Sequence, residues 1–254
     1  MPIAKNDESI TSMADWQRLA PPKSAHHWVD DRSAKEAARA WLEGGGAEMP
    51  IEVEQSLSAN RSFGPVLSWH AEPEARLRFD DLKGEPRNSD LAVTVHDAHG
   101  SYFLAVEAKA DEPYGETVSD AFAAALERRL VNPRSKGIAR IESLASGLLG
   151  SRSADLPKAG NIRYQLLTAA AGCIAEARRQ GASRAVLLVH EFITRATRDE
   201  NHKRNRADLT NFLARLGGAP VETIVDATLY GPFDTAFGVG VNLYVGKAAR
   251  NLRS

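Results

Sequence analysis

Two β-rich segments joined by a short polar turn constrain the fold of this chain more than any other feature. Residues 89–96 (SDLAVTVH) and 101–109 (SYFLAVEAK) are rich in β-branched and aromatic side chains, and large apolar residues stand at every second position. The connecting residues 97–100 (DAHG) contain Asp and Gly, which are typical of tight turns. This pattern predicts an antiparallel β-hairpin, and it fixes which residues of the two strands lie opposite one another.

The length of the turn sets the register of the predicted hairpin. A loop centred on residues 98–99 places Asp90 directly opposite Glu107. Opposed residues share one face of a sheet, with Cβ atoms about 4.5–5.5 Å apart. The other face then carries only large apolar side chains, namely Leu91, Val93, Val95, Tyr102, Leu104 and Val106. A shift of one residue would mix this apolar set with polar residues, so the apolar pattern supports the register.

The register places two carboxylates and a lysine side by side at one end of the sheet. Lys109 lies two residues beyond Glu107 and therefore on the same face as Glu107 and Asp90. Two like charges this close are unfavourable unless they share a proton or a cation. Such a pair suits an oxygen-seeking ion such as Mg²⁺, with water completing its octahedron. An ordinary surface ion pair between Lys109 and Glu107 is the alternative interpretation.

The segments around the hairpin predict an α/β protein with a mixed central sheet flanked by helices. Helical spacing of apolar residues predicts helices at 33–42, 50–59, 120–130, 137–149, 164–181 and 206–218. Further strands are predicted at 75–81, 185–192 and 236–246, and the continuous apolar run at 185–192 favours burial on both faces. A polar N-terminus interrupted by Pro21-Pro22 predicts a loose arm over 1–25, followed by a single domain over 26–254.

The hairpin motif resembles that of a known superfamily. Asp90, a turn and a strand ending in Glu107-Ala108-Lys109 are similar to the motif of the PD-(D/E)xK phosphodiesterases, which include restriction endonucleases and repair nucleases. The resemblance covers roughly residues 33–192 and is closest to uncharacterised bacterial members of that superfamily. It implies a restriction-endonuclease-like core in the order helix, three strands, helix, strand. Ser89 stands where the motif has proline, a departure that removes no ligand.

The resemblance also implies a role for individual residues. Asp90 and Glu107 would ligate Mg²⁺ or Mn²⁺, and the backbone carbonyl of Ala108 would be a third ligand. Lys109 would orient or activate the attacking water and offset charge at the phosphorus. Gln165 would occupy the place of a glutamine seen in some exonuclease branches. The catalytic set implied in this way is Asp90, Glu107, Lys109 and Gln165.

The charge of the chain is balanced overall but unevenly distributed. There are 32 Lys and Arg against 33 Asp and Glu, which gives a formal net charge of −1. Residues 72–127 hold 13 acids and 5 bases, whereas residues 128–158 hold 7 bases and 2 acids, and residues 195–206 hold 5 bases and 2 acids. The two basic segments predict a phosphate-binding rim beside the carboxylates, and hence a nucleic-acid partner, with DNA favoured. Solvated helix faces are the alternative explanation.

The remaining sequence features exclude several classes of protein. The single cysteine, Cys173, can form no internal disulfide, and it excludes a zinc ribbon or an iron–sulfur cluster. The N-terminus lacks a signal-peptide core, and the longest apolar run, 166–175, is shorter than a membrane span. These features predict a soluble cytoplasmic protein with no membrane partner.

Three functions compete for this sequence. The leading hypothesis is a metal-dependent nuclease-like hydrolase that acts on nucleic-acid phosphodiester bonds. The second is a catalytically silent binding module that keeps the nuclease fold. The third is an enzyme that uses Asp90 and Glu107 as general acid and base, as glycosidases do, but the pair is closer than that chemistry requires.

Overall fold

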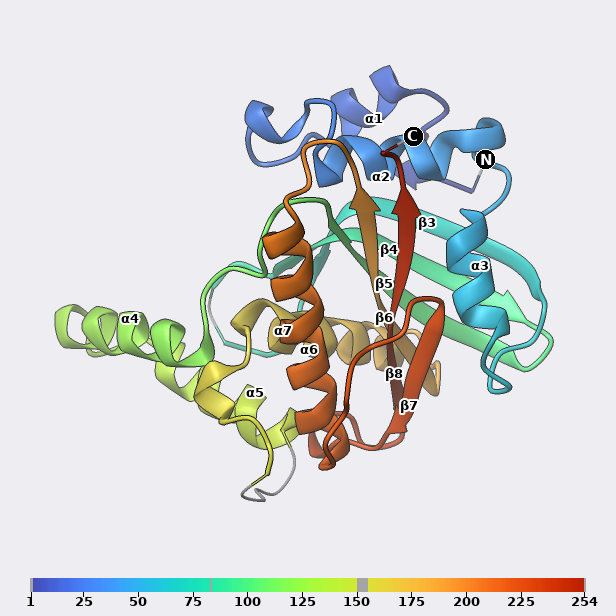
Figure 1. Ribbon diagram of the computed structural model, residues 1–254. Helices are drawn as coiled ribbons and strands as arrows, with labels where there is room; N and C mark the ends of the chain where they lie inside the picture. The colour runs from blue at the N-terminus through green and yellow to red at the C-terminus, as the bar shows by residue number, and fades with distance from the viewer. Residues whose placement is uncertain (1, 83, 150–154, 254) are drawn as a thin grey trace.

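A six-stranded mixed sheet organises the computed structural model, which describes residues 2–82, 84–149 and 155–253 (Figure 1). The strands are β3 (Val66–Leu77), β4 (Arg87–Asp97), β5 (Gly100–Lys109), β6 (Arg184–Ile193), β7 (Thr228–Phe233) and β8 (Asn242–Asn251). They follow the spatial order β3-β4-β5-β6-β8-β7. Strands β5, β6 and β8 are parallel, whereas β3, β4 and β7 pair antiparallel with their neighbours. The predicted α/β class with a mixed central sheet is confirmed.

Helices cover both faces of this sheet. They are α1 (Met13–Leu19), α2 (Ser33–Leu42), α3 (Ile51–Ser58), α4 (Val118–Val131), α5 (Gly137–Leu148), α6 (Tyr164–Arg179) and α7 (Asp199–Gly217). Helices α1 to α3 bury Trp16, Trp41 and Val53 against one face. Helices α4 to α7 contribute to the cluster on the other face, where Leu167 of α6 and Phe212 of α7 are fully buried. Burial of such side chains, at about 1.5–3 kcal/mol each, holds the layers together.

The predicted hairpin and its register are confirmed. Val93 pairs with Leu104, and the ladder runs to Asp97 opposite Gly100. The six apolar side chains predicted for one face all belong to the cluster beneath α1 to α3. Strand β6 pairs in parallel with β5, and its residues alternate between the two clusters, as expected of a strand buried on both faces.

The N-terminal segment differs from the prediction of a loose arm over 1–25. It forms the short strands β1 (Ala4–Lys5) and β2 (Glu8–Ser9), followed by α1. Ile3, Ile10 and Trp16 are at most 3% exposed and pack in the cluster beneath α1 to α3. A few widely spaced apolar residues therefore dock a polar segment onto the sheet, a pattern that neither strand nor helix periodicity reveals.

Several element boundaries also differ from the sequence-based predictions. Strand β3 begins at Val66 rather than at residue 75, and α7 begins at Asp199 rather than at residue 206. Strand β7 was not predicted. The alternating residues 236–241 form a short 3-10 helix, Ala236–Gly238, and a turn instead of a strand. In the turn, Gly240 takes a left-handed φ of 87°, which glycine adopts readily. Within the described parts of the chain, no helix combines the length and apolar character needed to cross a membrane.

Candidate active site

The residues predicted for the site come together where β4 begins and β5 ends. Asp90, Glu107, Ala108, Lys109 and Gln165 all line one cavity of about 530 Å³. The hairpin ladder ends with Leu91 opposite Val106, so the next position on each strand is a carboxylate. Gln165 reaches the same cavity from the first turn of α6.

Glu107 is the most heavily engaged side chain of the site. It is 3% exposed, and one carboxylate oxygen accepts a hydrogen bond from Lys109 Nζ at 2.9 Å. The side-chain amide of Gln165 donates to the same oxygen, and the guanidinium of Arg87 donates to the other. Burial raises the pKa of Glu107, but the positive charges of Lys109 and Arg87 outweigh it, and the pKa is lowered. Glu107 is therefore ionised at neutral pH.

Asp90 has the opposite electrostatic character. One of its oxygens accepts a hydrogen bond from the backbone N–H of Ala108 at 2.7 Å, and its other oxygen accepts none from the described residues. Burial and the negative charge of Glu107 raise the pKa of Asp90 to about 7, against the opposing charge of Lys109. Asp90 thus holds a proton near neutrality, and a bound cation would compete with that proton.

Arg87 is a site residue that the sequence analysis missed. Its guanidinium also donates to Thr168 Oγ1 at 3.1 Å, which ties β4 to α6. The arginine side chain is only 9% exposed and lies directly against Glu107. A buried acidic cluster needs a counter-charge. This general requirement is the signal from which a basic residue near Asp90 could have been expected.

A switch of faces in β3 brings Arg87 to the site. Ala71 packs in the cluster beneath α1 to α3, whereas Ala75 packs in the opposite cluster, although strict alternation would keep both on one face. Glu74 lies between them with a left-handed φ of 49°. Arg87 pairs with β3 beyond this switch and faces Glu107. Glu74 itself lines the cavity, where its carboxylate accepts a hydrogen bond from Asn88.

The donor set at the site fits a hard divalent cation. Two adjacent carboxylates and a backbone carbonyl are oxygen ligands, and Mg²⁺ commonly binds one or two carboxylates while keeping several waters. The oxygen of Asp90 that accepts no hydrogen bond is available as a ligand. In the residues that the structure describes, no group of three His, Cys, Asp or Glu side chains is placed to hold a metal. Binding at Glu107 would require Arg87 to release its oxygen.

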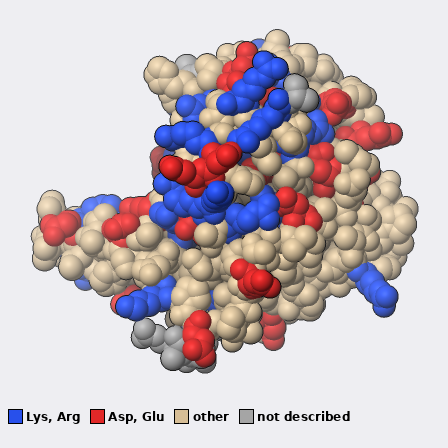
Figure 2. Space-filling view, viewed as in Figure 1, with Lys and Arg blue, Asp and Glu red and all other residues tan. Residues whose placement is uncertain are grey.

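Both basic segments reach the surroundings of the cavity. Arg198, at the start of α7, binds Asp111 just beyond β5, and Asn205 donates to the backbone carbonyl of Glu112, which lines the cavity. Arg140 from the other basic segment also lines the cavity; residues 150–154 of that segment lie outside the described residues. Figure 2 shows Lys and Arg gathered over the N-terminal half of α7, interleaved with acidic side chains.

The fold and cavity define an α/β protein with a carboxylate–lysine cluster at the end of a central hairpin. The chain belongs to the family described as a domain of unknown function, DUF6946, whose family model matches residues 9–252. No curated protein matches the chain, and no solved structure does. The family match includes all six strands of the large sheet and the candidate site.

Proposed function

We propose that this chain is a metal-dependent phosphodiesterase of the PD-(D/E)xK type that hydrolyses nucleic-acid backbones. The observation that carries the proposal is the convergence of Asp90, Glu107 and Lys109 on one cavity. Two carboxylates of contrasting pKa beside a lysine are an arrangement that favours catalysis over a structural ion pair. The basic segments near the cavity would attract a phosphate backbone to a site that is itself acidic.

Asp90, Glu107 and the Ala108 carbonyl would hold Mg²⁺ or Mn²⁺, which when bound polarises a phosphate and lowers the pKa of water. Lys109 is held at 2.9 Å from Glu107, and its ammonium lies 5.3 Å from the centre of the Tyr114 ring. These contacts fix the ammonium where it would orient the attacking water and offset negative charge at the phosphorus. Gln165 would help to keep the Glu107 carboxylate in place.

The direct test is cleavage of a mixed panel of single-stranded and duplex DNA and RNA with Mg²⁺ or Mn²⁺. We expect wild-type cleavage that EDTA abolishes. Lys109→Ala should lower the rate by about 10²–10⁴-fold, the range for loss of a positioned acid–base group. A matched control is Arg61→Ala, which removes an exposed basic side chain outside both the cavity and the two basic segments. Equal rates for Lys109→Ala and wild type would contradict the proposal.

A second function, a catalytically silent nuclease-fold module, is favoured by one specific observation. Arg87 and Lys109 already neutralise Glu107, so the carboxylate has no need of a metal. In this alternative the charge cluster joins β4, β5 and α6 and serves only the fold. The third hypothesis, acid–base catalysis by Asp90 and Glu107 alone, has no further observation in its favour.

Replacement of Arg87 by Met distinguishes the first two functions. If Glu107 is a metal ligand, Arg87→Met removes a competitor and should tighten Mg²⁺ binding by about tenfold, the equivalent of about 1.4 kcal/mol. The added Mg²⁺ should then raise the melting temperature more than in wild type, because it binds only the folded state. The measurements are isothermal titration and thermal unfolding over a Mg²⁺ series. Loss of stability in Arg87→Met with no Mg²⁺ response in either protein would support the silent module.

A further inference from the structure

A hollow of about 1330 Å³ lies near the candidate site, between α4 and α5. We call it the α4–α5 hollow. Five basic and three acidic side chains line it: Arg128, Arg129, Arg134, Lys136, Arg140, Asp81, Glu116 and Glu127. The hollow is therefore net positive in a protein whose formal charge is −1. Helix α4, which borders it, projects from the body of the molecule (Figure 1).

Three of the basic side chains in the α4–α5 hollow are free to bind a ligand. The guanidiniums of Arg128 and Arg134 and the ammonium of Lys136 form no ion pair with any described residue. By contrast, Arg140 is held by Asp80, with Nε at 2.6 Å from a carboxylate oxygen. Free cations on a concave surface are suited to phosphate groups, and arginine binds phosphate bidentately.

The floor of the α4–α5 hollow is apolar. Ala121 and Ile141 are buried there, and Leu82 and the half-buried Tyr164 also line the hollow. Cations at the rim with an aromatic and aliphatic floor match a nucleotide, whose phosphate is anionic and whose base stacks on apolar surface. In a duplex the bases are paired inside, so only an unpaired strand can use both parts of the lining.

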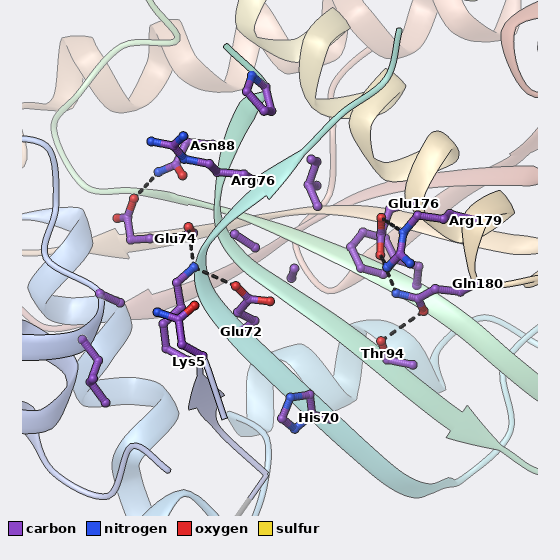
Figure 3. A pocket seen from close by; sticks show the side chains of 18 of the residues that line it. Lys5, His70, Glu72, Glu74, Arg76, Asn88, Thr94, Glu176, Arg179 and Gln180 are labelled. Atoms are coloured by element: carbon purple, nitrogen blue, oxygen red, sulfur yellow. Dashed lines mark hydrogen bonds and ion pairs between the residues drawn. The ribbon is translucent and has the colours of Figure 1, made fainter. Parts of the chain in front are cut away.

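The α4–α5 hollow adjoins the candidate site and shares two lining residues with it. Arg140 and Tyr164 line both the hollow and the 530 Å³ cavity that holds Asp90 and Glu107. On its other side that cavity adjoins a third hollow of about 820 Å³, beside β3 and the end of α6 (Figure 3).

The third hollow, unlike the α4–α5 hollow, has no excess of positive charge, because its four basic side chains (Lys5, Lys23, Arg76 and Arg179) are matched by four glutamates. Lys5 lies 2.7 Å from a carboxylate oxygen of Glu72, and Arg179 Nε donates to Glu176 at 2.8 Å (Figure 3). Four glutamates line it in all: Glu72, Glu74, Glu85 and Glu176. A phosphate backbone is therefore favoured on the α4–α5 side of the candidate site alone.

We infer that the α4–α5 hollow binds a single-stranded nucleic acid and holds the nucleotides on one side of the bond at the candidate site. The substrate class is thus an unpaired strand, with phosphates at Arg128, Arg134 and Lys136 and a base near Tyr164. This inference rests on the proposed function for the role of the strand, but strand binding is measurable without catalysis.

Binding in EDTA, followed by fluorescence anisotropy with labelled oligothymidylate, tests the inference. We expect the single strand to bind about tenfold more tightly than a hairpin duplex. The double variant Arg128→Ala/Arg134→Ala should weaken strand binding about tenfold and reduce the salt slope by about 1.4, at about 0.7 per lost phosphate contact. The matched control Arg61→Ala/Arg178→Ala removes two exposed arginines that lie outside the hollow, and it should change affinity less than twofold.

Tyr164 provides a second, charge-neutral readout. Tyr164→Leu should weaken strand binding about tenfold, within the range for loss of one stacked base, whereas Tyr164→Phe keeps the ring and should bind like wild type. Equal or tighter binding of the duplex, equal effects of the two arginine pairs, or no binding would overturn the inference. If the strand binds as expected but no substrate is cleaved, the inference stands and the nuclease proposal fails. If substrate is cleaved but the hollow variants bind the strand like wild type, the nuclease proposal stands and the inference fails.

Discussion

Replacement of Asp90 by Asn is expected to abolish cleavage and, at the same time, to stabilise the protein above neutral pH. In the proposed site, the Asp90 carboxylate would be the metal ligand with one oxygen that accepts no hydrogen bond from the described residues. Its loss should therefore weaken metal binding and lower the rate by about 10³-fold, or about 4 kcal/mol. The stabilisation has a separate cause, because the amide in the Asp90→Asn variant carries no charge beside Glu107 in a buried setting.

The sign of the stability effect follows from the raised pKa of Asp90. A carboxyl whose pKa rises from 3.8 to about 7 on folding binds its proton more tightly in the folded state. Wild-type stability should therefore fall as pH rises from about 4 to about 7, and Asp90→Asn should remove this loss. A difference of about 3 pKa units corresponds to at most about 4 kcal/mol in the free energy of unfolding. Because Asp90 is partly exposed, we expect a difference of about 1–2 kcal/mol between the variant and wild type.

Thermal unfolding of Asp90→Asn and wild type at several pH values measures this effect. The variant should melt about 2–8 °C higher at pH 8, at 2–4 °C per kcal/mol for a chain of this size, and close to wild type near pH 4. The control is Asp234→Asn, which replaces an exposed aspartate with no ion pair among the described residues. Because this variant keeps Asp90, its melting temperature should follow that of wild type at every pH. A variant that is both active and no more stable than wild type would contradict the assigned role of Asp90.

The hairpin part of the site could be predicted because alternation and turn length both encode it. One wholly apolar face and the DAHG turn leave one register, and that register alone places Asp90 beside Glu107. Alternation and turn length are local patterns, in which each residue's position depends on neighbours in sequence. Gln165, by contrast, is implied by the resemblance to the PD-(D/E)xK motif, and its side-chain amide donates to Glu107.

The rest of the site could not be predicted because it depends on backbone geometry without a sequence marker. The switch of faces in β3 occurs at Glu74, where neither Gly nor Asn signals a left-handed residue. Arg87 pairs with Leu77, beyond that switch, and donates to Glu107. The docking of the N-terminal segment could not be predicted for a similar reason, since Ile3 and Trp16 pack against residues that are distant in the sequence.

The largest effect on stability is expected at the other end of the hairpin, in the DAHG turn. Asp97 accepts hydrogen bonds from both terminal nitrogens of Arg184, at 2.8 and 2.9 Å, and from the backbone N–H groups of Gly64 and His99. Burial raises the pKa of Asp97, but Arg184 and these donors lower it by more, so the pair is charged. The aspartate side chain is fully buried, and the arginine side chain is 9% exposed.

Asp97→Ala should destabilise the fold by about 3–5 kcal/mol, because it leaves Arg184 buried beside the rings of Phe63 and Tyr102 without a counter-charge. The melting temperature should fall by roughly 6–20 °C. The double variant Asp97→Ala/Arg184→Met should recover part of the loss, since no unpaired charge then remains. Glu8→Ala, which breaks the exposed pair with Arg18, should cost at most about 1 kcal/mol. A loss as small in Asp97→Ala as in Glu8→Ala would contradict the stabilising role assigned to the buried pair of Asp97 and Arg184.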